Sequence, residues 1–213
     1  MEPNGIHAPA AQPSWNTRVK DNRPELEALE RDAELMLRVR DGDQASFGLL
    51  LERHRGPVIH FLYRMVQRQA VAEELAQEVF LRVYRARGTY EPTAKFTTWL
   101  FRIATHLALN SLRDGRNERL QERIDGEEEK PARQFSDQQP SVEAVMVKRV
   151  RTEEIRQAVA GLPEKQRAAV LMHKYQEMEY AQIAKILNCS ESAVKSLLFR
   201  AYETLRARLA HMA

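Results

Sequence analysis

Two cations and two hydroxyls occupy one face of a helix near the end of the chain. From Glu191 to Arg206 the apolar residues recur at the spacing of an amphipathic helix. The side chains on or beside its non-core face are Ser192, Lys195, Ser196, Phe199 and Arg200. Hydroxyls and cations near the start of a helix are typical of contacts with phosphates and with base edges in a major groove. This face therefore predicts DNA binding; the alternative is a helix hairpin with an ordinary solvated face.

A second polar stripe lies in the N-terminal half of the chain. It belongs to a helix predicted from Phe96 to Asp114, and its members follow helical spacing along one exposed side: Arg102, His106, Asn110 and Arg113. Cations and amides in such a row suit a nucleic-acid backbone or unstacked bases. A plain polar face has the same composition, so both interpretations stay open on these residues alone.

Paired carboxylates on another helix raise the question of catalysis. Glu74 and Glu78 stand one turn apart in the segment from Ala72 to Ala86. Metal or acid–base chemistry would need further ligands or cleft residues, and the sequence offers none nearby. We therefore predict no catalytic residue, no metal and no cofactor. The face that carries Glu74 and Glu78 is therefore either an ordinary solvated surface or a surface that docks a protein.

The polar face between Glu191 and Arg206 is positioned by a pair of helices with a tight turn between them. Only Asn-Cys-Ser separates the helix that ends at Leu187 from the helix that follows. Asn188 can adopt the left-handed conformation that ends a helix, and Ser190 can cap the next helix. The spacing predicts a helix-turn-helix.

The remaining helical patterns predict an all-α protein of two small helical domains joined by a flexible linker. Residues 1–31 contain four prolines and little periodicity, so we expect a disordered tail. Residues 32–114 form the first domain and residues 142–213 the second, which contains the helix-turn-helix. The polar, acidic segment 115–141 has no core of its own and is the linker.

Composition agrees with a nucleic-acid partner in a reducing compartment. The net charge is +3, and two basic domains flank the acidic linker. The single cysteine, Cys189, excludes an internal disulfide. Because no apolar run reaches spanning length and no signal-peptide pattern opens the chain, we expect a cytoplasmic protein without membrane insertion.

Several short motifs, taken in order, resemble the extracytoplasmic-function sigma factors of the sigma-70 family. The N-terminal half contains Asp-Gly-Asp-x-x-x-Phe from Asp41, Ala-Glu-Glu-Leu-x-Gln-Glu-Val-Phe from Ala72 and Phe-x-x-Trp-Leu-x-x-Ile-Ala from Phe96. The C-terminal half adds Leu162-Pro163, Ala-x-Ile-Ala from Ala181 and Ala-Val-Lys-Ser-x-Leu-x-Arg-Ala from Ala193. The resemblance covers the chain from Asp32 to Leu209.

This resemblance implies a bacterial alternative sigma factor, which is not an enzyme but binds core RNA polymerase and directs initiation at selected promoters. The motif from Ala72 matches the part that grips the clamp helices of the β′ subunit; its residues here are Glu74, Gln77, Glu78 and Phe80. The stripe from Arg102 to Arg113 matches the reader of the minus-ten promoter element, although His106 stands where the family usually has Asn. The helix-turn-helix matches the reader of the minus-thirty-five element. The β flap and an anti-sigma protein are further implied partners.

Two alternatives follow from the residues themselves. A helix-turn-helix regulator that is not a polymerase subunit would need a receiver or ligand domain, and the N-terminal half shows no alternating strands. An adaptor that binds polymerase without reading DNA is disfavoured by Lys195 and Arg200. Because a flexible linker joins the two small domains, we expect few contacts between them and many relative arrangements.

Overall fold

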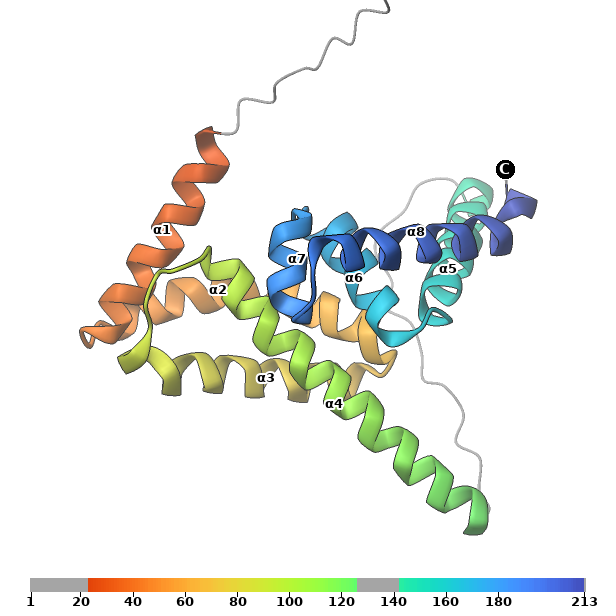
Figure 1. Cartoon of the computed structure of the whole chain (residues 1–213), viewed down its shortest axis with the longest axis horizontal. Helices are drawn as coiled ribbons and strands as arrows, with labels where there is room; N and C mark the ends of the chain where they lie inside the picture. The colour runs from red at the N-terminus through yellow and green to blue at the C-terminus, as the bar shows by residue number, and fades with distance from the viewer. Residues whose placement is uncertain (1–22, 126–141, 213) are drawn as a thin grey trace, which may run out of the picture.

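The computed structural model describes residues 23–125 and 142–212, and every regular element in these ranges is a helix. The N-terminal half consists of α1 (Arg23–Arg40), α2 (Gln44–Val66), α3 (Gln69–Arg85), the 3-10 helix η1 (Ala86–Thr89) and α4 (Phe96–Asp125). The C-terminal half consists of α5 (Val142–Ala160), α6 (Glu164–Tyr175), α7 (Tyr180–Leu187), α8 (Glu191–Arg208) and the 3-10 helix η2 (Ala210–Met212). The all-α fold is confirmed, with the C-terminal helices against the N-terminal ones (Figure 1).

Local side chains fix where α2 begins and ends. The Asp43 carboxylate accepts the backbone N–H groups of Ala45 at 2.9 Å and Ser46 at 3.3 Å, as an N-cap residue does. At the other end Gln67 adopts the left-handed conformation with φ 59°, and its N–H bonds to the Tyr63 carbonyl. The chain thereby reverses into α3, which packs along α2.

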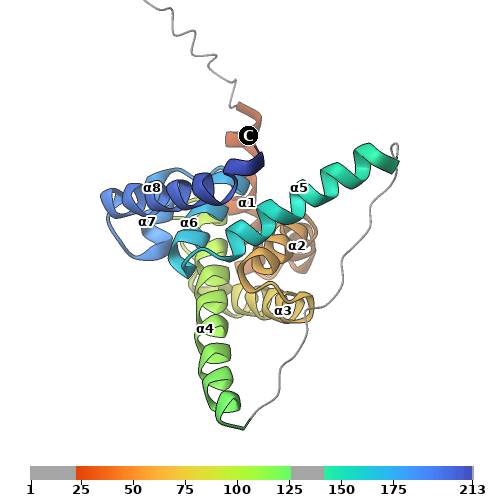
Figure 2. The same cartoon turned by 90° about the vertical axis from the view of Figure 1, so that its right-hand side faces the viewer.

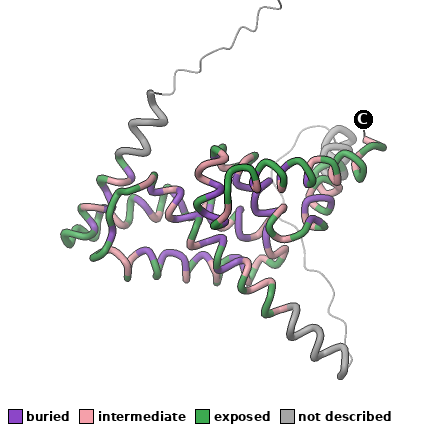
Figure 3. Tube along the Cα trace, viewed as in Figure 1, coloured by how far each residue is buried: buried purple, intermediate pink, exposed green. Residues whose placement is uncertain are grey.

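The core of the N-terminal half lies where α4 crosses α2 and α3. Phe61 of α2 meets Phe101 of α4 edge-to-face with ring centroids 5.2 Å apart, a favourable aromatic geometry. The buried segments follow the inner sides of these helices (Figure 3). Two sides of α4 are buried: Leu100 and Ala104 mark one, and Thr98 and Thr105 belong to the other.

The helix-turn-helix forms as the sequence predicts. Asn188 has φ 50° and ψ 56°, the left-handed conformation that ends α7. The Ser190 hydroxyl then caps α8 by accepting the Ala193 N–H at 3.2 Å. Ile183 and Ile186 of α7 and Val194 of α8 are fully buried, so the pair is held by a shared core.

The two halves pack against each other, contrary to the expectation of few contacts between them. Helix α7 lies along α4, and α6 contacts the end of α2. The Gln182 side chain donates to the Thr98 hydroxyl at 3.1 Å, and the Thr105 hydroxyl lies 4.0 Å from the Met172 sulfur. Because Thr105 is fully buried in this contact, the interface excludes water there.

The predicted boundaries differ from the structure at two places. Helix α4 continues through Gly115 to Asp125, into the segment predicted as linker, and α1 begins at Arg23, inside the predicted tail. The rest of that tail and linker lies outside the described residues. The far end of α4 and the first turns of α5 extend away from the body (Figure 2). Among the described helices, none has the length and apolar content to cross a membrane.

Candidate nucleic-acid interface

Helix α8 separates a buried side from an exposed polar side. Val194, Leu198 and Ala201 are buried against the other helices of the C-terminal half. The residues predicted to bind DNA are all exposed: Ser192, Lys195, Ser196, Phe199 and Arg200. The structure therefore places all five at the solvent side of one helix.

The polar groups of this side are available to a ligand. Within the described part of the chain, neither Lys195 nor Arg200 forms an ion pair. The Ser196 hydroxyl donates to the Ser192 carbonyl at 3.0 Å, so its oxygen stays at the surface. Phe199 is 68% exposed, the most exposed of the large apolar side chains. An exposed ring beside two free cations suits a thymine methyl group or a base face next to phosphates.

A tyrosine–histidine contact fixes how α8 sits on α6. His173 of α6 lies 3.1 Å from the Tyr202 hydroxyl, measured from Nδ1. Desolvation by burial, with a smaller contribution from Tyr180, raises the pKa of Tyr202, so its hydroxyl stays protonated. Tyr202 stands about two turns after Lys195, at the edge of the exposed face, so the polar contact anchors that edge of α8 to α6.

The second predicted stripe also lies on one exposed side. Arg102, His106, Asn110 and Arg113 are exposed along α4, while Leu107 and Ala108 between them are buried. Only Arg113 has a described ionic partner, Asp114 at 3.5 Å. Both groups of that pair are largely solvated, so it contributes little to holding the arginine. The stripe is therefore a row of accessible donors.

An aromatic cluster borders the stripe, and helical periodicity alone does not predict it. Trp99 is half-buried one turn before Arg102, and its ring packs 5.1 Å from Tyr90 and 5.9 Å from Phe96. Helical spacing assigns Trp99 to the core, because Trp99 lies three positions after Phe96 and four before Ile103, on the same side of the helix. Only the fold shows that part of the indole reaches the surface beside a row of donors.

The predicted docking face of α3 needs one correction. Glu74 and Gln77 are exposed and Glu78 is half-buried, where it accepts a 2.7 Å bond from Arg82. Phe80 is only 6% exposed and lies in the core, so its ring is not available to a partner. Its neighbour is the exposed apolar residue of this face: Leu81 is 48% exposed. Leu81 stands one turn beyond Gln77 and Glu78, on their side of the helix.

A buried carboxylate joins the first two helices of the N-terminal half. Asp32 of α1 is 3% exposed, bonds to Nε2 of His54 at 2.8 Å and pairs with Arg53. His54 also packs its ring 5.4 Å from Phe96. Among the residues that the structure describes, no group of three His, Cys, Asp or Glu side chains could hold a metal ion. The Asp32 cluster therefore joins α1 to α2.

A phenol next to this cluster is buried as well. None of the residues that the structure describes forms a hydrogen bond with the Tyr90 hydroxyl. Desolvation raises the pKa of Tyr90, and the charge of Asp32 adds to this effect. The group stays neutral, and its position is set by the aromatic cluster.

Two protein families match separate parts of the chain. The family described as Sigma-70 region 2 matches residues 50–118, and the family described as Sigma-70, region 4 matches residues 152–205. The first match contains α3 and the α4 stripe, and the second contains the helix-turn-helix.

Curated relatives match most of the chain. It is 30% identical over 181 residues to the RNA polymerase sigma-H factor of Pseudomonas aeruginosa, covering 83% of this chain and 92% of that protein. It is 33% identical over 184 residues to the ECF RNA polymerase sigma-E factor of Escherichia coli, covering 82% and 92%.

Two solved structures share the fold at 20% sequence identity and a TM-score of 0.63. One is CnrH in complex with the cytosolic domain of CnrY, with 86% of this chain and 99% of that chain covered. The other is the sigma factor RpoE in complex with the anti-sigma factor NepR from Bartonella quintana, with 77% and 96% covered.

Proposed function

The chain belongs to the extracytoplasmic-function group of the sigma-70 family, and we propose how its helices divide the work of a sigma factor, which binds core RNA polymerase and directs transcription from selected promoters. The observation that carries the proposal is the exposed face of α8. Its cations have no described partner, while Val194 and Leu198 hold the helix from behind. Helix α8 thus reads the minus-thirty-five element in a major groove.

The stripe on α4 reads the minus-ten element in this proposal. Arg102 and Arg113 bind the backbone, and His106 and Asn110 present polar edges to bases. The half-exposed Trp99 ring offers a stacking surface at one end of the stripe. His106 in place of the usual Asn gives this reader its own base preference.

Arg102→Ala tests the α4 reader. Loss of one unpaired cation should weaken binding of the polymerase complex to a minus-ten oligonucleotide and lower the salt dependence by about one phosphate contact. Arg55→Ala is the matched control, because Arg55 is an exposed cation of α2 outside the stripe. If the two variants bind the oligonucleotide equally well, the stripe is not part of the DNA interface.

The face of α3 docks the chain onto the β′ clamp helices in this proposal. Glu74, Gln77 and Glu78 supply polar contacts, and Leu81 takes the apolar role that the resemblance implied for Phe80. The C-terminal half contacts the β flap. The chain contributes binding and recognition, while the polymerase supplies the catalysis.

Leu81→Ala tests whether this face of α3 docks onto the polymerase. Its side chain is about half exposed, so Leu81→Ala should leave the fold intact and reduce retention by core polymerase in a pull-down. The triple change of Glu74, Gln77 and Glu78 to alanine should have the same effect. Leu49→Ala is the control, because Leu49 is 52% exposed on α2. Wild-type retention of the Leu81 variant would place the docking surface elsewhere.

Transcription in vitro tests the function as a whole. Core polymerase with this protein should produce discrete transcripts from genomic DNA that core polymerase alone does not produce. Protein that binds DNA but yields no new start sites would favour the helix-turn-helix regulator instead.

An anti-sigma protein is a proposed further partner. The similarity to RpoE, whose structure holds the anti-sigma factor NepR, supports this assignment together with the family membership. Co-purification of the chain from its own cells should identify such a partner.

A further inference from the structure

A row of side-chain contacts leads from the buried carboxylate of α1 to the indole beside the α4 stripe. The Asp32 carboxylate bonds to Nε2 of His54 at 2.8 Å, and the His54 ring packs 5.4 Å from the Phe96 ring. Phe96 lies 5.9 Å from Trp99, and both rings also contact Tyr90. These separations are typical of attractive contacts between rings. We call the row the Asp32–Trp99 path; its members are Asp32, His54, Phe96, Tyr90 and Trp99.

The path begins in the core and ends at the surface. Asp32 is 3% exposed, His54 is 7% exposed and Phe96 is fully buried, so none of the three can touch DNA. Trp99 is half-buried, and part of its ring reaches the surface one turn before Arg102. The path therefore joins a buried hydrogen bond to the stacking surface of the proposed minus-ten reader.

The buried hydrogen bond gives the His54 ring one orientation. The last torsion of a ring side chain is soft, whereas a bond from Nε2 to a fixed oxygen holds the plane of the imidazole. Arg53 also pairs with Asp32, so the carboxylate is itself held in place. Because His54 packs on Phe96 and the interior is closely packed, a fixed imidazole limits the tilt that the next rings can adopt.

We propose that Asp32 and His54 are positioning residues of the minus-ten reader: through Phe96 they set the angle at which the Trp99 indole meets an unstacked base. This inference rests on the proposed role of α4. A buried ion pair is often no more stabilising than apolar side chains of similar volume, so orientation is what this pair adds. A base stacks on an indole only when the two planes align, so a changed tilt weakens binding although no DNA contact is removed.

Apolar replacement of the pair tests the proposal. Asp32→Val and His54→Leu, made together and called the apolar pair, keep a similar volume and leave no buried charge, because Arg53 is 37% exposed and can be solvated. The midpoint of urea unfolding should stay close to that of the wild type. The polymerase complex should bind a single-stranded minus-ten oligonucleotide about fivefold more weakly or worse, since stacking on an aromatic ring contributes roughly 5- to 150-fold per base. The oligonucleotide is taken from a promoter that the transcription assay identifies.

Two single changes divide the pair into its hydrogen bond and its ring. Asp32→Asn keeps an oxygen that can accept the imidazole N–H, so its affinity for the oligonucleotide should be that of the wild type. His54→Gln can still bond to Asp32 but offers no ring to Phe96, so its affinity should fall as it does with the apolar pair. Wild-type affinity of His54→Gln would overturn the proposal even if the apolar pair did not fold.

A fluorescent base shows whether the lost affinity is lost stacking. 2-Aminopurine fluoresces when it is unstacked and is quenched on an aromatic ring. At the position that meets Trp99 the probe should stay dark in the wild-type complex and brighten with the apolar pair. The salt dependence of binding should not change, because the apolar pair keeps the cations of the stripe, whereas Arg102→Ala should lower it. A probe that stays dark with the apolar pair would contradict the proposal.

A change in the middle of the path shows whether the effect passes through Phe96. Phe96→Leu alone should reduce affinity for the oligonucleotide. In that background the apolar pair should cause no further loss, because residues that act through one contact are not additive. If the two losses multiply, the pair acts on binding by another route and the proposal is overturned.

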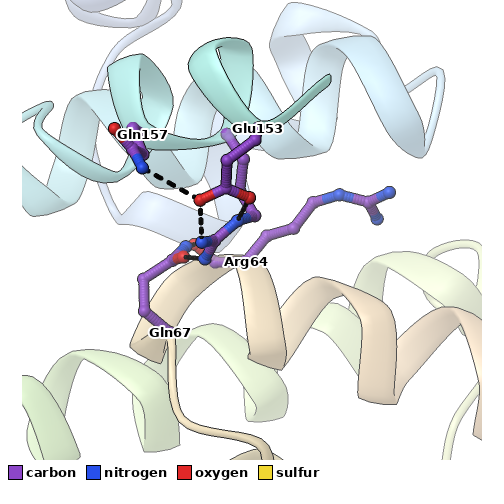
Figure 4. Close-up of polar contacts among 5 residues, drawn as sticks. Arg64, Gln67, Glu153 and Gln157 are labelled. Carbon is purple, nitrogen blue, oxygen red and sulfur yellow. Dashed lines mark hydrogen bonds and ion pairs between the residues drawn. The ribbon is translucent and has the colours of Figure 1, made fainter. Parts of the chain in front are cut away.

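Two controls separate positioning from stability. Asp43→Ala removes the N-cap of α2 and should lower the urea midpoint, but His54 lies about 16 Å further along the helix. Gln157→Ala removes a 3.0 Å bond to Glu153 in a polar cluster outside the path (Figure 4). Both variants should bind the oligonucleotide as the wild type does. A loss with Asp43→Ala as large as that with the apolar pair would show that stability alone explains the effect.

The same assay separates this inference from the proposed function. If Trp99→Ala and Arg102→Ala both leave binding unchanged, α4 is not the minus-ten reader and the inference falls with it. If Trp99→Ala weakens binding and the apolar pair does not, α4 remains the reader and the positioning role of Asp32 and His54 is overturned.

Discussion

Lys195→Ala and Arg200→Ala together should abolish recognition of the minus-thirty-five element. Each side chain is expected to contribute about 1–3 kcal/mol if it reaches a base edge. Because neither cation has a described protein partner, its removal leaves no buried charge behind and the helix-turn-helix should stay folded. Titration of a duplex that carries the element, at several salt concentrations, measures the loss.

The salt series distinguishes two kinds of contact. A base contact weakens only the cognate sequence, whereas a phosphate contact weakens all sequences alike and lowers the salt dependence. Lys165→Ala is the control, since Lys165 is an exposed cation at the start of α6. If the double variant binds the element as tightly as this control does, α8 is not the reader.

Asp32→Ala should strongly destabilise the N-terminal half. The carboxylate is 3% exposed and holds both His54 and Arg53, so its loss leaves a buried histidine without its partner. Breaking a buried pair of this kind typically costs about 3–5 kcal/mol. Because Arg53 is partly solvated, we expect the lower end of that range. Urea unfolding should show a lower midpoint with an unchanged slope.

An exposed aspartate nearby provides the comparison for this change. Asp41 also pairs with an arginine, Arg40 at 3.3 Å, but its side chain is 70% exposed. Asp41→Ala should therefore change the free energy of unfolding by less than about 1 kcal/mol. Equal midpoints for the two variants would show that the Asp32 pair does not hold α1 on α2.

The elements predicted correctly are those with local signals. Asn188 and Ser190 end one helix and cap the next through their own side chains and backbone, so their types alone located the turn. The exposed faces of α4 and α8 followed from helical spacing for the same reason. In each case the deciding interactions join residues within about one turn of each other.

Burial at the edge of an apolar stripe was harder to predict. Phe80 and Leu81 are both large and apolar, and adjacent positions point about 100° apart on a helix. Choosing which of them faces the core requires knowing where α2 and α4 lie. The family resemblance implied that Phe80 contacts the polymerase, whereas the fold buries Phe80 and exposes Leu81.

Contacts between distant residues were not predictable from periodicity. The buried Arg167 of α6 donates to the Met65 carbonyl 102 positions away, and Asp32 bonds to His54 22 positions away. Arg167 stands in the first turn of a helix, where a basic residue has no dipole to complement and no special role. Its guanidinium donates to the carbonyls of Met65, Ala160 and Leu162, which come together because the ends of α2 and α5 meet there.

The position of Arg167 also makes separation of the halves asymmetric. Two of its carbonyl partners, Ala160 and Leu162, belong to its own half and stay bonded when the halves part. The third, Met65, loses the Arg167 donor, and the last turn of α2 is left to water. Fraying should therefore appear at the C-terminal end of α2 and not at the α5–α6 turn. If the halves separate, amide hydrogens of that last turn should exchange faster, while those at the start of α6 keep their protection.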